Sequence, residues 1–318
     1  MPGRGALAAG GNLSLWEIKI TMFDINKTAK LACFAALILG PINAAAQQSS
    51  THQSRKPGDL DAIRKVSTLI GAGVMNHTNS KIAALRDLAF SPDGRVQYAI
   101  LGCGGVAGVG ETYTAVPIDL LGVRNDEGKW AVNLDIAGEN LKKAPTIKSD
   151  NYHELLDPAW IKQVDQFVRS YGDSANHPGR IASALEREHR ALERVLLATK
   201  IRSTTVRNTQ NQDLGKVEDL LLDQNDRVSF VVMARGGVLG VGEHHIPVPW
   251  LRLSLGENRE NAAIGVVIDA TKAQLEKAPI VKADNYATLL APGFADQVRE
   301  YFGMGKRAKA APSEKTPH

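Results

Sequence analysis

Cysteine is almost absent from this sequence, since its 318 residues include only Cys33 and Cys103. Cys33 lies in an N-terminal segment with the features of a cleaved export signal, so the mature chain would keep Cys103 alone. A single thiol excludes an internal disulfide, and stability in an oxidising compartment must then come from packing. We interpret Cys103 as a small buried apolar residue, with a cross-link between two copies of the chain as the alternative.

Aromatic residues and excess charge are also scarce. Aromatics make up 5% of the chain and the formal net charge is +4. Removing the first 46 residues discards four cations and two anions, which leaves +2. A nucleic-acid surface usually needs a concentrated basic stripe and aromatic side chains for base stacking. We therefore expect no nucleic-acid partner.

Hydrophobic runs long enough to cross a membrane are scarce. The apolar run at the N-terminus, Leu31 to Leu39, is short. Lys27 and Lys30 precede it, and small residues at 44–46 follow, which is typical of a secretory signal peptide. We predict a signal peptide at 1–46 and a mature chain that is periplasmic or otherwise exported. The run is short for a membrane span, so a retained anchor is the lesser alternative. Met22 stands where such a signal usually begins, and residues 1–21 are then an over-extended start.

The chain contains one long stretch twice, 132 residues apart. Gly104–Glu111 and Gly236–Glu243 differ at a single position, Ala107 against Leu239. The same shift superimposes further pairs: Val74/Val206, Asn76/Asn208, Asp87/Asp219, Leu88/Leu220, Arg95/Arg227, Val96/Val228, Val116/Val248 and Pro117/Pro249. A two-residue slip then aligns Lys143–Pro145 with Lys277–Pro279, and Asp150–Tyr152 with Asp284–Tyr286. So many matches in nearly one register indicate a duplication.

This repeat sets the predicted domain organisation. After the signal peptide we expect a flexible tail at 47–65, a first copy with a helical extension at 66–172, a linker helix at 173–197, a second copy with a helical extension at 198–303 and a disordered tail at 304–318. Both copies are longer than a solenoid unit, so each is expected to have its own core. The linker prediction rests on apolar residues at helical spacing between Arg180 and Lys200.

Within a copy, short strands come first and helices last. The β-branched runs 95–101 and 227–233 follow turn residues, which predicts hairpins. Ile246–Trp250 is expected at a sheet edge, because its two prolines lack an amide donor. Several short strands in so few residues favour a small closed or sandwiched sheet. Thr271–Gln274 has the pattern of a capping box, and further helices are expected at about 159–171 and 294–302.

Segments of the second copy resemble the PRC-barrel family, named for the cytoplasmic domain of the photosynthetic reaction-centre H subunit. These segments are Val206–Asn208, Leu214–Asp223, Gly236–Gly242 and Val248–Trp250, and Leu275–Pro279 with Asp284–Tyr286 resembles the extension of stand-alone bacterial members. The resemblance implies a mainly β fold of two tandem small barrels, each followed by short helices. It implies docking surfaces and no shared active site. The first copy departs at Ala83 and Ile118, which stand where the second has Gly215 and Trp250.

One glycine-rich run imitates a nucleotide-binding motif. Gly102–Ala107 fits the GxGxxA form of a dinucleotide fingerprint and follows a strand. That fingerprint requires a helix next, whereas more glycines and another strand follow here, and the second copy has Ala234 in place of Gly102. We predict instead a sharp or bulged β-connection with positive φ.

Histidines and recurring acids are the remaining candidates for metal-binding or catalytic residues. His244 and His245 are adjacent on a predicted strand, so they point to opposite faces, and we interpret them as surface residues rather than metal ligands. The acids that recur in both copies are Asp87/Asp219, Glu111/Glu243, Asp135/Asp269 and Asp150/Asp284. Paired acids can perform acid–base chemistry, but several lie beside turns and helix starts, which favours capping and turn roles.

The sequence therefore predicts no catalytic, cofactor-binding or metal-binding residues and no cofactor. We expect a non-enzymatic exported scaffold that uses its two barrels to bind an envelope protein or another copy of itself. The alternative is an envelope protein that binds a small ligand or a metal. Membrane association is expected only through a partner or an uncleaved signal.

Overall fold

The computed structural model describes residues 63–105, 110–126, 129–134, 136–148, 152–172, 182, 194–238, 241–257, 264–282, 285–291 and 293–305. All of them lie in one compact unit, His52–His318. Within these residues, no helix has the length and apolar character needed to cross a membrane. The predicted signal peptide at 1–46, and nearly all of the predicted tails and linker, lie outside the described ranges.

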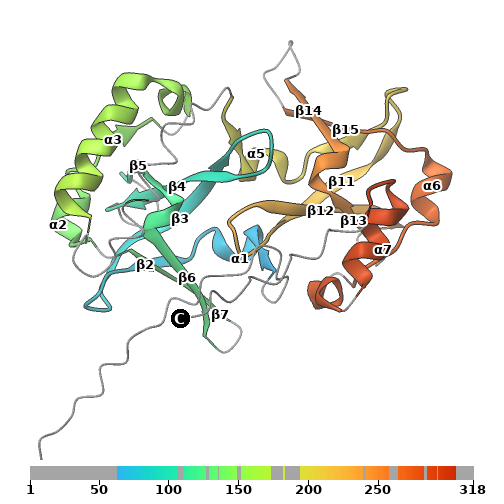
Figure 1. The fold of residues 1–318 in the computed structure, drawn as a ribbon, viewed down its shortest axis with the longest axis horizontal. Coiled ribbons are helices and arrows are strands. Elements are labelled where there is room, and N and C mark those ends of the chain that lie inside the picture. Colours follow the sequence, from blue (N-terminus) through green and yellow to red (C-terminus); the bar gives the residue numbers. More distant parts are fainter. Residues whose placement is uncertain are drawn as a thin grey trace, which may run out of the picture. The chain divides into compact units, whose positions relative to one another are not determined.

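The two copies repeat the same series of elements, except that an isolated bridge between His245 and Val281 takes the place of β8 in the second copy (Figure 1). The first contains β1 (Arg64–Lys65), α1 (Val66–Leu69), β2 (Gly73–Met75), β3 (Lys81–Phe90), β4 (Val96–Cys103), β5 (Thr112–Pro117), η1 (Ile118–Leu120), β6 (Leu121–Asp126), β7 (Lys129–Leu134), α2 (Gly138–Leu141), β8 (Thr146–Ile147), η2 (Tyr152–Leu156) and α3 (Pro158–Tyr171). The second contains β9 (Leu196–Leu197), α5 (Ala198–Ile201), β10 (Thr205–Arg207), β11 (Asp213–Leu222), β12 (Val228–Val238), β13 (Val241–Pro249), η3 (Trp250–Arg252), β14 (Leu253–Glu257), β15 (Ile264–Ile268), α6 (Lys272–Glu276), η4 (Tyr286–Leu290) and α7 (Phe294–Tyr301).

Each copy builds one strongly bent sheet. The first sheet runs β6-β7-β2-β3-β4-β5-β8 and the second runs β13-β12-β11-β10-β15-β14. Neighbours are antiparallel except β2 with β7 and β10 with β15, which are parallel. These sheets and their short helices confirm the predicted fold class of two tandem barrels. The predicted hairpins at β3–β4 and β11–β12 are present, and β13, with its two prolines, ends its sheet as expected.

One short segment of each copy adds a strand to the sheet of the other copy. β1 pairs with β11, and β9 pairs with β3. We call Arg64–Leu69 the first arm and Leu196–Ile201 the second arm. The register repeats with the sequence shift, because Arg64 faces Leu222 while Leu196 faces Phe90. The two copies therefore exchange arms reciprocally.

The arms correct two sequence-based predictions. Arg64 and Lys65 fall in the predicted flexible tail and instead form β1. Leu196 and Leu197 fall at the end of the predicted linker helix and instead form β9. The physical reason is the same in both cases, because backbone pairing with a strand far away in sequence outweighs the local pattern. At the second arm, burial of two leucines adds about 1.5–3 kcal/mol for each side chain.

The buried side chains of the two copies form one continuous cluster. The expectation of a separate core for each copy is therefore wrong. The arms are the reason, since Val66 and Leu69 are buried against the second copy's β11, and Ala198 and Ile201 are buried against the first copy's β3. Neither sheet completes its core without residues of the other copy.

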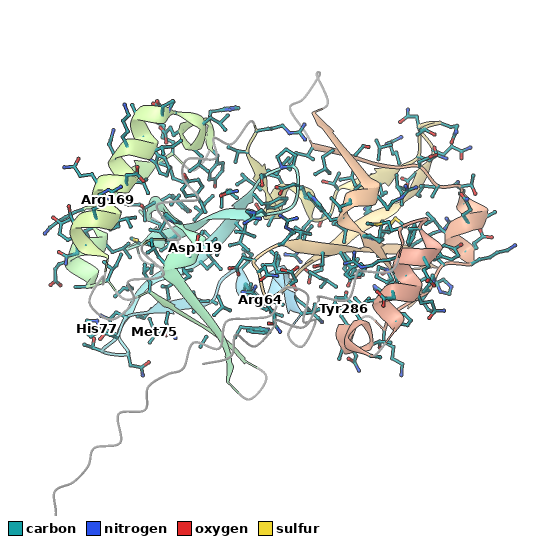
Figure 2. All side chains as sticks on the ribbon, in the orientation of Figure 1. Arg64, Met75, His77, Asp119, Arg169 and Tyr286 are labelled. Carbon is teal, nitrogen blue, oxygen red and sulfur yellow. The ribbon has the colours of Figure 1, made fainter. Side chains whose placement is uncertain are left out.

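The terminal helices cover the outer part of each copy. Asp157 caps α3 by accepting from the amide of Ala159, and Pro158 occupies the first helical position. Helix α3 buries Trp160 edge-on against Tyr98, whereas Arg169 lies on its exposed face (Figure 2).

The predicted capping box is confirmed at α6. The side chain of Thr271 accepts from the amide of Gln274, and the side chain of Gln274 accepts from the amide of Thr271. The two helix-start amides are thus satisfied reciprocally. Helix α7 follows η4 and covers the second sheet through the buried residues Ala295 and Val298.

Candidate functional site

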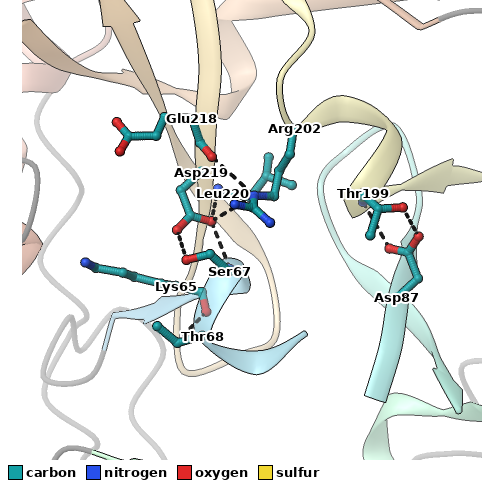
Figure 3. A network of polar contacts seen from close by, with 9 residues as sticks. All are labelled: Lys65, Ser67, Thr68, Asp87, Thr199, Arg202, Glu218, Asp219 and Leu220. Atoms are coloured by element: carbon teal, nitrogen blue, oxygen red, sulfur yellow. Dashed lines mark hydrogen bonds and ion pairs between the residues drawn. The ribbon is translucent and has the colours of Figure 1, made fainter. Parts of the chain in front are cut away.

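Two equivalent aspartates hold the exchanged arms (Figure 3). Asp219 of β11 accepts from the amide of Ser67 at 3.0 Å and from its hydroxyl. Asp87 of β3 accepts from the amide of Thr199 at 3.1 Å and from its hydroxyl. Ser67 and Thr199 are the second residues of α1 and α5, so each aspartate caps a short helix of the opposite copy.

Both aspartates are buried, and each also binds its own strand. Asp87 accepts from the amide of Leu88 at 2.7 Å, and Asp219 accepts from the amide of Leu220 at 2.9 Å. Burial raises the pKa of Asp87, and the hydrogen bonds from Thr199 and Leu88 oppose that rise. These contacts confirm the capping interpretation for this pair of acids. The two aspartates join the copies, because each carboxylate accepts one hydrogen bond from its own strand and others from the arm of the opposite copy.

The two hairpin turns meet through reciprocal backbone hydrogen bonds. The amide of Val96 donates to the carbonyl of Asp226 at 2.8 Å, and the amide of Val228 donates to the carbonyl of Gly94 at 2.7 Å. These residues correspond under the 132-residue shift. We call the arms, the two capping aspartates and these turns the junction.

Trp250 makes the junction asymmetric. Its indole nitrogen donates to the carbonyl of Pro92 at 2.9 Å, and its ring meets Phe90 edge-on at 5.3 Å. Gly94 has a φ of +84°, and a Cβ at that position would lie 2.7 Å from the Trp250 ring. The equivalent of Gly94 is Asp226, which forms an ion pair with Arg64 at 2.8 Å. The Trp250 ring thus requires a glycine at position 94. The equivalent position, 226, has an aspartate that binds Arg64.

A hollow of about 670 Å³ opens on the first copy beside β3 and β4. We call it the first-copy hollow, and it is lined by Lys81, Ile82, Ala83, Ala84, Arg86, Gly102, Gly104, Gly105, Glu111 and Tyr113. Arg86 donates from Nε to Oε2 of Glu111 at 2.9 Å and from Nη2 to Oε1. The Arg86 guanidinium lowers the pKa of Glu111 through these hydrogen bonds and its charge. This acid is therefore an ion-pair partner and does not cap a helix.

A β-bulge positions Arg86. Leu85 faces Leu101 and Asp87 faces Ile100, so Arg86 is the extra residue of β3. Glu218 is the extra residue at the same place in β11. A bulge re-aims the side chains around it, and here it turns Arg86 toward the hollow while Asp87 reaches the second arm.

The second copy has a different set of groups at this place. His245, the equivalent of Tyr113, is buried, and its Nδ1 contacts Oε2 of Glu218. The prediction of a surface residue is therefore wrong for His245, whereas His244 is exposed as predicted. His245 is covered because the Val281 amide donates to its carbonyl and brings that segment over β13.

Tyr286 extends this second-copy cluster to the first arm (Figure 2). Lys65 places its ammonium 4.2 Å from the centre of the Tyr286 ring, a cation–π contact. Burial raises the pKa of Tyr286 above its usual range, and the charge of Glu218 adds to the effect. The first arm is thus held by a ring contact in addition to its cap.

The glycine-rich runs have the backbone that the sequence predicts. Gly104, Gly105 and Gly110 have positive φ, as do Gly236 and Gly242. In the first copy the next described element is β5, and in the second copy β12 pairs directly with β13. The described parts of both runs therefore lie between strands.

The remaining candidate groups are dispersed. Cys103 is half-buried, and burial raises the pKa of its thiol, with a further contribution from the Glu111 charge. Glu243 and Asp269 are exposed. Asp135, Asp150 and Asp284 lie outside the described residues. The part of the chain that the structure describes contains no group of three or more His, Cys, Asp or Glu placed to hold a metal ion.

Comparison with known families agrees with this architecture. The model of the PRC-barrel domain matches residues 63–140 and 193–275, which together make up half of the chain. Each matched range includes one arm. No curated protein matches the chain.

Proposed function

The chain belongs to the PRC-barrel family, and we propose that it is a non-enzymatic, exported scaffold whose two barrels bind an envelope protein. PRC-barrel domains are generally interaction modules. The observation that carries the proposal is the junction, because exchanged arms and reciprocal caps fix the outer surfaces of the two copies at one spacing. Two surfaces at a fixed spacing raise the effective concentration of the second contact once the first has formed.

Export is the part of the proposal that the N-terminal sequence supports. Lys27, Lys30, the apolar run and the small residues at 44–46 favour secretion and cleavage. Fractionation of cells that express a C-terminally tagged chain, with mass spectrometry of its N-terminus, tests this. We expect a periplasmic protein that begins close to residue 47. Recovery of the uncleaved chain in the cytoplasm would overturn export.

Partner binding is tested by cross-linking in intact cells followed by capture of the tagged chain. We expect a cross-linked species that contains an envelope protein at a defined ratio to the chain. Lys81→Glu and Lys277→Glu, made separately, each reverse one exposed charge, on the first and on the second copy, so a loss of the cross-link with only one of them shows which copy the partner contacts. Recovery of free monomer alone, with and without cross-linker, would contradict the scaffold role.

A second candidate, a protein that binds a small ligand, is favoured by the volume of the first-copy hollow. Pockets of about 300–1,000 Å³ commonly hold small molecules. A ligand that binds the native state selectively raises the melting temperature, so a thermal-shift screen against metabolites and metal ions separates this candidate from the scaffold. A saturable rise with a small molecule supports it, and a flat screen contradicts it.

A further inference from the structure

The first-copy hollow presents two cations to solvent. Lys81 is exposed, and the side chain of Arg86 is 35% exposed. The acid among the lining residues, Glu111, has a side chain only 7% exposed, and Arg86 already occupies both of its oxygens. An incoming ligand therefore meets the two cations, while the carboxylate that pairs with Arg86, and whose charge also acts on Lys81, lies beneath the surface.

Two glycines lie against the side chains of the hollow. A Cβ on Gly73 would be 3.4 Å from Cε of Lys81, so the lysine stem lies directly over this residue. A Cβ on Gly102 would be 2.7 Å from Oε2 of Glu111 and 3.0 Å from Cγ of Arg86. Gly102 thus allows the Arg86–Glu111 pair to lie against the sheet. Neither glycine has a positive φ, and a Cβ on Gly73 would make only an ordinary contact, so space is needed at Gly102 alone.

The second copy lacks all four features at the equivalent positions. Under the 132-residue shift, Thr205 and Ala234 replace the glycines, and Asp213 and Glu218 replace the cations. Both copies nevertheless form the same strands and the same bulge. The shared strands and bulge thus form with either set of residues, and the glycines and cations are particular to the first copy.

We propose that the first-copy hollow binds an extended acidic peptide segment of the partner protein, with carboxylates paired to Lys81 and Arg86. The hollow is larger than one anion needs, and Ile82 and Tyr113 add apolar surface beside the cations. A row of alternating side chains fits this combination better than a single free ion. This inference rests on the proposed scaffold function and names the chemistry of the partner.

The test is calorimetric titration of the purified chain with a capped hexapeptide of alternating glycine and glutamate. The matched peptide has glutamine in place of glutamate, and free glutarate is the small-anion probe. We expect the glutamate peptide to bind at least about tenfold more tightly than the glutamine peptide at low salt. Lys81→Glu, which turns an attraction into a repulsion, should weaken binding about tenfold or more.

Two further variants keep the test specific. Lys277→Glu makes the same change of net charge on the second copy and should leave the affinity unchanged. Gly73→Thr installs the second copy's residue beneath Lys81 and should weaken binding while the folded circular dichroism spectrum is retained. Equal weakening by Lys81→Glu and Lys277→Glu would overturn the site, because it would reflect net charge alone.

The remaining outcomes separate this site from the scaffold role. Equal binding of the two peptides, or glutarate binding as tightly as the glutamate peptide, would overturn the peptide assignment. If an envelope partner is still cross-linked under that outcome, the scaffold function stands and the partner uses another surface. If the peptide binds as expected but no partner is captured, the hollow stands and the envelope role fails.

Discussion

Arg95 forms a β-bridge with Arg227, which is its own counterpart in the second copy. A residue pairs with its equivalent on an axis of twofold pseudosymmetry, where backbone contacts occur twice with the partners reversed. The exchanged arms, the capping aspartates and the turn hydrogen bonds all follow this rule. The chain thus holds, within a single polypeptide, an interface of the kind found in a twofold dimer, and Trp250 is a departure from that symmetry.

The capping aspartates should be among the most sensitive positions of the junction. Asp219→Ala leaves the amides of Ser67 and Leu220 without their acceptor in a buried place, and we expect a loss of about 1–3 kcal/mol in the free energy of unfolding. Asp87→Ala should cost a similar amount. Urea denaturation measures both, with the exposed Asp269→Ala as the control. Losses below about 0.5 kcal/mol for both variants, typical of surface sites, would contradict the capping role.

Trp250 and Gly94 should behave as a coupled pair. Trp250→Ile, which installs the first copy's residue, removes the hydrogen bond to Pro92 and the contact with Phe90, at a cost of about 2–3 kcal/mol. Gly94→Ala drives a methyl group into the indole ring and strains a positive φ. Once Trp250→Ile has removed the ring, only the strain remains, so the double variant should be about 1 kcal/mol more stable than the sum of the single effects predicts. Additive losses in a double-mutant cycle would disprove the contact.

Cutting the chain between the copies should not separate them. A protease site inserted between Gly172 and Arg194 can be cleaved after the full chain has folded. We expect the two fragments to elute together in size-exclusion chromatography, because each arm is buried in the opposite copy. The Asp87→Ala and Asp219→Ala double variant, cut in the same way, should dissociate at a lower urea concentration. Separation of the wild-type fragments without denaturant would be incompatible with the exchange.

The pH dependence of stability should report on Asp87. Burial raises its folded pKa above the ordinary value of 3.8, so the folded protein holds this proton more tightly than the unfolded chain does. The stabilising contribution is complete below pH 3.8 and is lost as the pH rises through the raised pKa. Relative to Asp87→Asn, the wild type should therefore lose free energy of unfolding as the pH rises above about 4, followed by a plateau.

Glu111 provides a control of the opposite sign. Its folded pKa is lowered by Arg86, so its contribution is present above the ordinary value of 4.5 and is lost as the pH falls. Relative to Glu111→Gln, the wild type should gain stability as the pH rises. Urea denaturation at a series of pH values measures both differences. If both differences, wild type minus Asp87→Asn and wild type minus Glu111→Gln, changed with pH in the same direction, neither would report the titration of its own carboxyl group.

Local pattern predicts much of each copy. The turn residues before Arg95 and Arg227 identify the hairpins, the prolines of β13 place it at an edge, and Thr271 with Gln274 identifies the start of α6. The capping interpretation of Asp87 and Asp219 is also confirmed. These features depend on residues close together in the chain or on the repeat itself.

The exchange of arms between the copies cannot be predicted from local sequence pattern. Because β3 and β11 carry the same pattern, an arm could pair with its own copy or with the other copy and satisfy that pattern equally. Leu196 also fits a helical spacing with Leu192, which favours a helix over the observed strand. The burial of His245 depends on Val281, which lies on a segment beyond β15, and the alternation along β13 contains no signal for it.

The first-copy hollow escapes sequence-based prediction for a related reason. Its signal is a set of differences between the copies at residues 73, 81, 86 and 102, whereas a repeat is recognised by identity. One of these differences, Gly102 in the first copy and Ala234 in the second, is visible in the sequence, but there it only weighs against a nucleotide-binding motif. Aligned duplicates can therefore reveal a specific site at the positions where they disagree.

The second arm also sets an order of events during synthesis. Ala89 and Phe90 of β3 leave the ribosome more than 100 residues before Leu196 and Leu197, which complete that part of the sheet. Until then β3 lacks the strand that the second arm adds, and Asp87 lacks the amide and hydroxyl of Thr199. The N-terminal half cannot reach its native state ahead of the C-terminal half, and the two must finish folding together.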